Sequence, residues 1–555
     1  MNELDQKIID AVKVAVKNVY DIEPDESMLM VESPRDPKMG DYSTNIAMRL
    51  ARSLRKNPFD IANGLVEAIA KELPEMESVT VARPGFINFK VKTSTLTGII
   101  NHIIEKDYLY GINDSGKDKN ILVEYVSANP TGDLHCGHAR NACWGDCMTR
   151  ILKASGYNCL REFYINDAGN QIDMLGKSLI ARYYEALGHE GEYELPENGY
   201  HAEDIKGIAK DIVDMDGDKW LNVKDEDGRM DYFKAEGVKR ELKKIQDDLR
   251  LYRCEFDSWM HETFFYKNDS KRINDVLDKM AEMGLTYEKD GALWFKSSEY
   301  GDDKDRVLRK STGYLSYLTP DIANHVYKYQ RGYEKMVNLW GADHHSYVTR
   351  MNCALTALGY PKGTLEVDLI QMVRMTENGK EVKMSKRTGN AITIRELCED
   401  VGVDAARWFF VSKDVATHMD FDLGLARSKN TENPVYYAQY AYTRMYSVLN
   451  NPAIPLFHQE INYELLTDEK ELQMLKQISE FPGVVADAAA TRMPNKICNY
   501  ILTLAKNFHS YYGNTKVNLP ENLELTNQRL GLVKACEITM KNALNLLGIE
   551  APTHM

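Results

Sequence analysis

The stretch from Ile121 to His138 reads Ile-Leu-Val-Glu-Tyr-Val-Ser-Ala-Asn-Pro-Thr-Gly-Asp-Leu-His-Cys-Gly-His. Its apolar run over 121–126 predicts a buried strand, and Asn129-Pro130-Thr131-Gly132 predicts a turn. A helical pattern follows over 137–155, and a second strand is expected over 159–165. Strand, helix and strand in this order predict a parallel sheet with right-handed crossovers, and therefore an α/β fold.

The same alternation resumes further along the chain after an interruption. A polar, acidic stretch over about 185–310 is expected to be an insertion. Strands predicted over 336–339 and 365–373 then enclose a helix that ends near Gly359. We expect a Rossmann-like parallel sheet over 115–395, split by this insertion.

Different patterns flank the α/β region. Helical periodicity followed by two strand-like runs around Arg83-Pro84-Gly85 predicts a separate α+β domain over 1–100. After a connecting helical segment over 396–430, long amphipathic segments predict an all-helical domain over 431–555. The chain is thus expected to fold as three domains and one connecting segment.

The composition of the 555 residues is that of an ordinary globular protein, with 43% apolar and 27% charged residues. No run approaches the roughly 18 apolar residues that a membrane span needs, and the start, MNELDQKIID, lacks the pattern of a signal peptide. The nine cysteines include no Cys-x-x-Cys pair, which indicates reduced thiols and a cytoplasmic protein. A net charge of −14 argues against unspecific polyanion binding, but a nucleic acid can still dock on a local basic face.

Two segments carry phosphate-binding chemistry. Ligands of an open α/β sheet bind outside the carboxyl ends of its strands, and the helix that starts near Gly137 points free N–H groups there. His135 and His138 can donate hydrogen bonds to phosphate oxygens. Lys383 and Lys386 supply ammonium groups that stabilise the charge of a departing pyrophosphate. A lysine-rich loop alone is more often a solvated turn, and only its pairing with the first motif predicts a nucleotide triphosphate site.

A zinc site is an alternative interpretation of the first motif. His135 and His138 are metal-binding residue types, and Cys143 and Cys147 have a spacing that structural zinc tolerates. These cysteines lie one turn apart on a predicted helix beside a tryptophan, which is typical of packing, and no second pair with ligand spacing follows. We therefore expect neither zinc nor another protein-bound metal.

The two motifs resemble the HIGH and KMSKS signatures of class I aminoacyl-tRNA synthetases. Further segments narrow the resemblance to the arginyl-tRNA synthetase family, and it covers nearly the whole chain. These segments are Val123–His138, Tyr317–Ile322, His418–Leu423, Glu432–Ala441, and the amino-terminal pair Gly40–Asn45 and Arg83–Asn88.

This resemblance implies a reaction in two steps. The carboxylate of L-arginine attacks ATP, which binds with Mg²⁺, and gives arginyl-adenylate and pyrophosphate. The arginyl group then passes to the 2′-hydroxyl of the terminal adenosine of tRNA(Arg), without a covalent protein nucleophile. It also implies a monomer whose amino-terminal domain contacts the tRNA elbow and whose carboxyl-terminal helices bind the anticodon. Tyrosines that can stack on bases, or fill a helix core, lie there at Tyr436, Tyr437, Tyr440 and Tyr442.

The resemblance assigns residues to an arginine pocket. Glu262 and Asp321 would bind the guanidinium, which is planar and always charged, with Tyr317 beside them. Glu124 and Asn129 would hold the α-amino and carboxylate end. Considered without the resemblance, Glu124 also fits an ordinary strand-end carboxylate, Asp321 a helix N-cap, and Tyr317 core packing.

It also assigns residues to ATP binding and to catalysis. Gly137 and Ser385 belong to the two signatures, and Asp343 can accept hydrogen bonds from the adenosine ribose at a second sheet end. His344 is expected on the amino-acid side, although its segment departs from the glutamine-containing version that some members carry. The catalytic groups would be His135, His138, Lys383 and Lys386.

Two other functions fit parts of the pattern. Another class I synthetase, for example the cysteinyl type, shares both signatures but would need a zinc site in its amino-acid pocket. A noncatalytic tRNA-binding paralogue would not need the intact histidines and lysines of the two signatures. Charging of tRNA with arginine is expected of an arginyl-tRNA synthetase. It is expected neither of another class I synthetase nor of a noncatalytic paralogue.

Overall fold

The computed structural model describes residues 3–32, 34, 36, 39–201, 203–382, 391–460 and 462–555. Within these ranges, five parallel strands form a central sheet in the order β12-β11-β5-β6-β7. In that order their bounds are Leu365–Ile370, Lys335–Gly341, Asn120–Glu124, Asn158–Ile165 and Ser258–His261. The predicted α/β class with a parallel sheet is confirmed.

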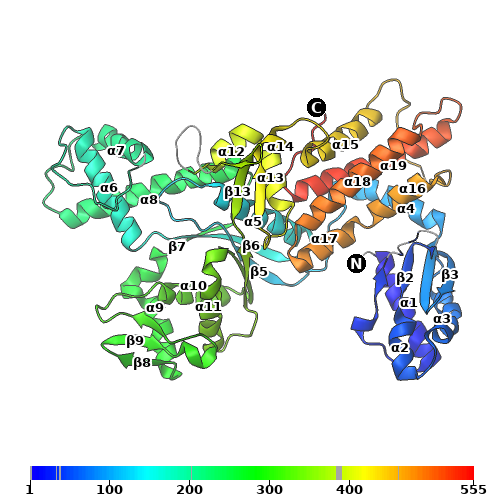
Figure 1. Ribbon diagram of the computed structural model, residues 1–555, viewed down its shortest axis with the longest axis horizontal. Coiled ribbons are helices and arrows are strands. Elements are labelled where there is room, and N and C mark those ends of the chain that lie inside the picture. The colour runs from blue at the N-terminus through cyan, green and yellow to red at the C-terminus, as the bar shows by residue number, and fades with distance from the viewer. Residues whose placement is uncertain are drawn as a thin grey trace.

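The order of the strands reverses between β5 and β11. The chain builds β5, β6 and β7 on one side and later adds β11 and β12 on the other. Ligands of doubly wound sheets bind at such a switch point, outside the carboxyl ends of the strands. Helix α5 (Cys136–Ala154) follows β5 and is buried over nearly its whole length. It lies between the sheet and the carboxyl-terminal helices (Figure 1).

Strand β5 ends two residues earlier than the sequence predicts. Val126 and Ser127 both have left-handed backbone conformations, with φ of 66° and 42°. A strand cannot continue through such residues, because the β region lies at negative φ. The apolar character of the run hid this turn.

The strand predicted over 365–373 is wrong as a single element. β12 ends at Ile370, and β13 (Val373–Glu377) joins another sheet, where it pairs with β14 (Lys380–Glu381) and β15 (Met419–Asp422). Between the two strands, Gln371 N–H donates a hydrogen bond to Val415 O instead of continuing the ladder with β11.

The interruption predicted over 185–310 contains a strand of the central sheet. Three helices first form a body with its own core: α6 (Asn170–Ala186), α7 (Glu203–Asp216) and α8 (Glu226–Leu251). The chain then returns to the central sheet as β7, which pairs with β6. Sequence periodicity missed β7 because it has only four residues, and most of them are half-buried.

A smaller antiparallel sheet follows β7 and packs with helices into a second core. Its strands are β8 (Thr286–Lys289), β9 (Ala292–Phe295) and β10 (Arg306–Arg309). Its helices are α9 (Thr263–Glu282), α10 (Leu318–Gln330) and α11 (His345–Ala357), which lie below the central sheet in Figure 1.

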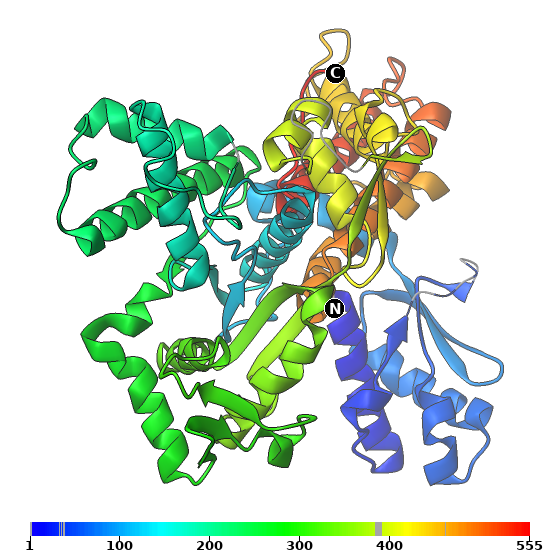
Figure 2. The ribbon, with the colours of Figure 1, turned by 60° about the vertical axis from the view of Figure 1, so that its left-hand side comes forward.

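The amino-terminal part has a separate core and an antiparallel sheet in the order β1-β2-β4-β3. Its helices are α1 (Glu3–Tyr20), α2 (Ile46–Leu54) and α3 (Pro58–Glu72), and its strands are β1 (Val31–Glu32), β2 (Tyr42–Thr44), β3 (Met76–Ala82) and β4 (Phe86–Val91). Figure 2 shows this part standing apart from the central sheet. Helix α4 (Thr93–Lys106) connects it to the rest.

The carboxyl-terminal helices share one hydrophobic core with α5 and the central sheet. Their bounds are Ile394–Val401 (α12), Val403–Val411 (α13), Leu423–Arg427 (α14), Pro434–Leu449 (α15), Glu469–Ser479 (α16), Phe481–Thr491 (α17), Asn495–Asn514 (α18) and Leu523–Leu546 (α19). Arg407 of α13, fully buried, donates hydrogen bonds to Asp146 of α5, to Tyr252 O after α8 and to Leu547 O after α19. Among the described helices, none is long and apolar enough to cross a membrane.

Candidate active site

His135 and His138 lie at the start of α5, beside the switch point of the sheet. The Nδ1 atom of His135 accepts a hydrogen bond from Gly137 N–H at 3.1 Å, and the Nδ1 atom of His138 accepts one from His135 N–H at 3.3 Å. The ring centroids are 3.9 Å apart. Because each Nδ1 is an acceptor, each neutral ring carries its hydrogen on Nε2 and can donate it to a ligand.

Both histidines have lowered pKa values. Burial, and then the neighbouring His135, lower the pKa of His138 to about 3. Burial lowers the pKa of His135 as well. The two rings are therefore neutral near pH 7 and act as hydrogen-bond donors rather than as cations. Glycine at position 137 leaves room for the His135 ring, since a Cβ there would lie 3.0 Å from Cε1 of His135.

The turn after β5 is strained and is held by Asn141 of α5. Val126 N–H donates to Asn141 Oδ1 at 2.8 Å, and Asn141 Nδ2 donates to Leu339 O at 3.0 Å. A β-branched residue at φ of 66° costs of the order of 1–3 kcal/mol, so the surrounding contacts must impose it. Asn141 thereby joins β5, α5 and β11 at the switch point. The sequence analysis missed this residue, although a polar side chain on a buried helix is a detectable signal.

Glu124 ends β5 within a buried chain of charges. Lys328 of α10 forms an ion pair with Glu124 Oε2 and lies 3.7 Å from Glu162 Oε1. Arg331 Nη1 contacts Glu162 Oε2 at 2.6 Å, and Ser127 Oγ donates to Glu124 Oε1 at 3.1 Å. Glu124 is therefore a strand-end carboxylate with an ion pair and a hydrogen bond inside the protein, and its role in binding a substrate stays a prediction. The sequence analysis did not identify Lys328 as the ion-pair partner of Glu124, although Lys328 lies seven residues after Asp321 on one face of α10.

Glu262 and Asp321 are two carboxylates without a cation. Among the described residues, neither has a Lys, Arg or His nitrogen within 4.0 Å. Asp321 Oδ2 accepts a hydrogen bond from Tyr347 at 2.5 Å, and Glu262 Oε1 accepts one from Tyr266 at 3.2 Å. Burial, and then the charge of Asp321, raise the pKa of Glu262 to about 7. Burial, and then the charge of Glu124, raise that of Asp321 to about 6.

The three acidic residues converge on Tyr164 at the end of β6. Burial raises the pKa of this tyrosine, and the charges of Asp321, Glu262 and Glu124 raise it further. Its hydroxyl is buried without a hydrogen-bond partner among the described atoms. The three carboxylates thus lie close enough to Tyr164 to act on it together, and their role in binding a substrate stays a prediction.

Other predicted pocket residues lie at the rim or form different contacts. Tyr317 is 70% exposed, which excludes core packing, and it is also the N-cap residue of α10, so Asp321 belongs to the first turn instead. Asn129 Nδ2 donates to Gln171 at 2.6 Å. Asp343 and His344 have largely exposed side chains and face each other at 3.5 Å, which does not place His344 in contact with the carboxylates.

Lys383, Ser385 and Lys386 lie outside the described residues. The described residues on either side of this segment form backbone hydrogen bonds. Val382 N–H donates to Met375 O at 2.8 Å. On the other side, Cys136 N–H donates to Ile392 O at 3.1 Å and Ile394 N–H donates to Leu134 O at 2.8 Å. The described residues that flank the second signature are therefore hydrogen-bonded to β13 on one side and to Leu134 and Cys136 of the first signature on the other.

The cysteines of α5 form packing contacts. Cys143 and Cys147 are fully buried with sulfur atoms 4.0 Å apart, and they donate to Arg407 O and Leu547 O respectively. Within the described part of the chain, no group of three His, Cys, Asp or Glu residues is placed to hold a metal ion. The absence of zinc stays a prediction.

The tyrosines of α15 divide into two groups. Tyr436 and Tyr440 stack with an interplanar angle of 11°, and Tyr440 also stacks on His509 of α18. Arg444 lies over the Tyr440 ring. Tyr442 is only 3% exposed and its hydroxyl donates to Glu537 at 2.8 Å, so it fills the helical core and cannot stack on a base.

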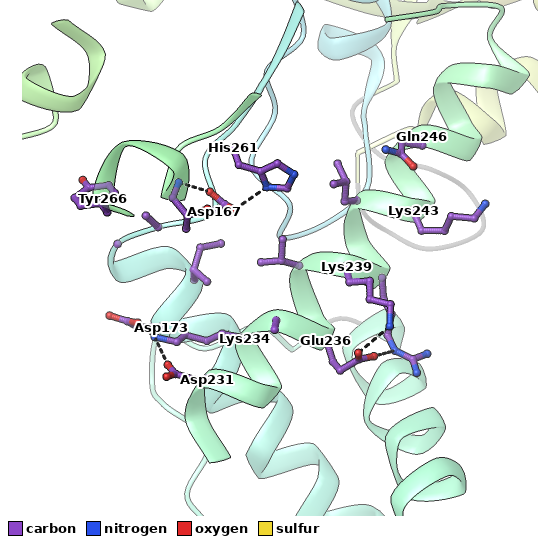
Figure 3. A pocket seen from close by; sticks show the side chains of 18 residues that line it. Asp167, Asp173, Asp231, Lys234, Glu236, Lys239, Lys243, Gln246, His261 and Tyr266 are labelled. Carbon is purple, nitrogen blue, oxygen red and sulfur yellow. Dashed lines mark hydrogen bonds and ion pairs between the residues drawn. The ribbon is translucent and has the colours of Figure 1, made fainter. Parts of the chain in front are cut away.

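A cleft of about 1180 Å³ opens beside Glu262, between the end of β7 and helix α8. Figure 3 shows Asp167 and His261 in contact at one wall and lysines of α8 at the other. Tyr266, the hydrogen-bond partner of Glu262, also lines this cleft. Tyr266 therefore connects Glu262 to this cleft.

Comparison with known proteins gives one consistent result. Family models match residues 6–91 (arginyl tRNA synthetase N terminal domain), 99–420 (tRNA synthetases class I (R), catalytic domain) and 438–555 (DALR anticodon binding domain). The chain is 47% identical to arginine–tRNA ligase 1 of Halalkalibacterium halodurans over 100% of both chains. It is also 47% identical to the arginine–tRNA ligase of Bacillus subtilis, over 95% of this chain and 94% of that one. The Thermus thermophilus arginyl-tRNA synthetase structure aligns over 100% of both chains with a TM-score of 0.75 and 22% identity, and so shares the fold.

Proposed function

The chain belongs to the arginyl-tRNA synthetase family, and from this premise we propose how its residues ligate arginine to tRNA. It is an arginine–tRNA ligase whose substrates are arginine, ATP and tRNA. The cysteinyl-type and noncatalytic alternatives are excluded, because the relatives matched over their whole length are arginine ligases.

The pair Glu262 and Asp321 binds the guanidinium of arginine, and this pair is the observation that carries the proposal. Both carboxyls are held at raised pKa values by burial and by neighbouring carboxylates. A cation bound between them would lower both pKa values and relieve the repulsion. A guanidinium suits this role because it keeps its charge and presents several N–H donors in one plane. Neutral citrulline would leave the two carboxylates without a counter-charge.

Glu124 and Asn129 hold the other end of the substrate. Because Lys328 already neutralises Glu124, its carboxylate acts on the α-ammonium as an oriented hydrogen-bond acceptor. Asn129, fixed by Gln171, offers its amide to the carboxylate end. Selectivity for arginine then depends mainly on Glu262 and Asp321, which form no ion pair in the described structure, although the charge of Lys328 also acts on Asp321.

The start of α5 binds the phosphates of ATP, which enters as its magnesium complex. The helix N-terminus and the neutral His135 and His138 donate hydrogen bonds to phosphate oxygens. Lys383 and Lys386 supply positive charge as pyrophosphate leaves, and Gly137, Ser385 and Asp343 complete the ATP site. The arginine carboxylate attacks the α-phosphorus to form arginyl-adenylate, and the 2′-hydroxyl of the terminal adenosine of tRNA then takes the arginyl group.

The tRNA extends from this site to the carboxyl-terminal helices. Tyr436, Tyr440 and His509 form a row of stacked rings with Arg444 above it, a combination that binds unpaired bases. The amino-terminal part contacts the tRNA elbow. All nine cysteines lie in described ranges as buried free thiols, which supports a cytoplasmic enzyme. The enzyme acts as a monomer.

Aminoacylation of total tRNA with each standard amino acid in turn tests the proposal. Charging is expected with arginine alone, and charging with any other amino acid would overturn the specificity. Glu262→Gln and Asp321→Asn should each raise KM for arginine by about 10²-fold or more, because each leaves one carboxylate to hold the cation. KM for ATP should stay within about twofold in both variants. An unchanged KM for arginine would remove that residue from the pocket.

A further inference from the structure

Asp167, in the loop after β6, binds the chain on both sides of Glu262. Its Oδ2 accepts a hydrogen bond from His261 Nδ1 at 2.8 Å and another from Thr263 Oγ1 at 2.9 Å. Its Oδ1 accepts a third from Thr263 N–H at 2.9 Å. Figure 3 shows the contact with His261 at the wall of the cleft. One nearly buried carboxylate thus fixes the residues before and after Glu262.

Asp167 also caps the helix that begins directly after Glu262. Glu262 is the N-cap residue of α9, but its backbone is already helical (φ −60°, ψ −37°), and glutamate is not among the side chains favoured at this position. Here its side chain makes no capping bond, while Asp167 accepts the Thr263 N–H. The Glu262 carboxylate is therefore free to turn toward Tyr266 and the pocket.

The anchoring does not depend on the Glu262 side chain itself. Glu262 N–H donates to Ile165 O at 2.9 Å, which extends the ladder between β6 and β7. Although burial opposes it, the bonds from His261 and Thr263 lower the pKa of Asp167, so the carboxylate stays ionised near neutral pH. The backbone bond and Asp167 together fix the main chain from which the Glu262 side chain extends.

We propose that Asp167 is a positioning residue for arginine recognition, which holds His261 and Thr263 on either side of Glu262 and so aims the Glu262 carboxylate at the guanidinium. This inference rests on the proposed role of Glu262. A displacement of the order of 1 Å in a binding group can cost up to about 10²-fold in catalysis. Removal of Asp167 should therefore weaken arginine binding much more than ATP binding.

The test measures KM for arginine, KM for ATP and kcat in Asp167→Ala, Glu262→Gln and the double variant. Asp167→Ala should raise KM for arginine about tenfold or more, with KM for ATP within about twofold of the original. The inhibition constant of agmatine, which keeps the guanidinium and lacks the carboxylate, should rise in parallel. The double variant should match Glu262→Gln alone, because Asp167 acts through Glu262.

Asp173→Ala is the matched control. Asp173 lines the same cleft but pairs with Lys234 at 2.9 Å, so its loss should leave KM for arginine and inhibition by agmatine unchanged. Thr263→Val removes one of the three bonds with little change in shape. It should raise KM for arginine a few-fold, which keeps the test decisive if Asp167→Ala does not fold.

The outcomes distinguish the proposed role of Glu262 from the positioning role of Asp167. If Glu262→Gln leaves KM for arginine unchanged, the proposed role of Glu262 fails and the inference fails with it. If Glu262→Gln raises KM but Asp167→Ala and Thr263→Val do not, only the positioning role is overturned. Additive losses in the double variant would also overturn it, since they would mean that Asp167 acts independently of Glu262.

Discussion

Lys328 forms an ion pair with Glu124 in the interior of the protein. The Lys328 side chain is fully buried, and its ammonium also lies 3.7 Å from Glu162, which is fully buried too. One lysine therefore serves two carboxylates, and Arg331 supplies the second positive charge at the outer end. Loss of Lys328 would leave more negative charge in a region of low polarity than the remaining cation can offset.

Lys328→Met should destabilise the catalytic part of the enzyme strongly. An uncompensated buried charge typically costs about 3–5 kcal/mol, which corresponds to a fall of the order of 10 °C in the midpoint of thermal unfolding. Differential scanning calorimetry measures this midpoint directly. A second change, Glu162→Gln, removes one of the two carboxylates and should recover part of the loss.

An exposed ion pair provides the comparison for Lys328. Lys90 pairs with Glu77 at 3.1 Å, and both side chains are more than half exposed. Lys90→Met should lower the unfolding midpoint by no more than about 2 °C, because exposed pairs contribute about 0–1 kcal/mol. If Lys328→Met and Lys90→Met lowered the unfolding midpoint equally, the buried ion pair would stabilise the protein no more than the exposed one.

The sequence predicted the parts of this architecture that depend on neighbouring residues. The strand, turn and helix over Ile121–Ala154 follow from local apolar spacing and turn chemistry, and the structure has them with small shifts at the ends. Strand β7 escaped prediction because its pairing with β6 lies almost a hundred positions away. The end of β5 was predicted too late, because the strain at Val126 is imposed by Asn141 and cannot be inferred from an apolar run.

The same distinction holds for the site. The resemblance gave Glu124, Glu262 and Asp321, which the structure brings together around one tyrosine. It did not give Lys328, which meets Glu124 from 204 positions away, because a charge pair between distant elements leaves no local pattern. The sequence also could not indicate the contacts of Asp167, because its partners His261 and Thr263 follow the whole helical insertion in the chain.

Arginine binding should weaken as the pH falls below about 7. Burial and the charge of Asp321 raise the pKa of Glu262 to about 7, so this carboxyl is protonated in the free enzyme at lower pH. The guanidinium needs the ionised form, and arginine stays charged throughout this range. The dissociation constant, measured by calorimetric titration, should rise about tenfold per pH unit below 7. In Glu262→Gln the dissociation constant for arginine should be larger than that of the unchanged enzyme at pH 8. It should not show the rise below pH 7 that protonation of Glu262 causes.

The same raised pKa predicts how arginine stabilises the enzyme. A carboxyl with a higher pKa in the folded state than in the unfolded state holds its proton more tightly when folded. Its contribution to stability is therefore lost as the pH rises from about 4.5 toward 7. The positive charge of bound arginine offsets the destabilisation of the folded state by the ionised Glu262 carboxylate. The rise in unfolding temperature that arginine causes should be larger at pH 8 than at pH 6, and a reversed order would contradict the charge assignment.

Asn141→Ala should impair the site without touching a substrate. It removes the acceptor for Val126 N–H and the donor to Leu339 O, which leaves two buried backbone groups unpaired at a cost of about 1–3 kcal/mol each. The strained turn can then relax, and Glu124 and Asn129 on either side of it should shift. KM for arginine should rise, whereas Asn63→Ala, in α3 of the amino-terminal part with its separate core, should leave KM unchanged.

His138 should act in catalysis as a neutral donor. Its pKa is lowered to about 3, so it remains uncharged across the pH range in which the enzyme is assayed. Its Nδ1 is occupied by His135 N–H, which leaves Nε2–H for a phosphate oxygen. His138→Ala should reduce kcat for pyrophosphate exchange by about 10²–10³-fold, the usual effect of losing one such donor. His138→Gln can place an amide N–H at a similar reach and should retain much more activity. If instead kcat of the unchanged enzyme falls as the pH rises through 6.5, and His138→Gln is as inactive as His138→Ala, the ring works as a cation and its burial does not control its charge.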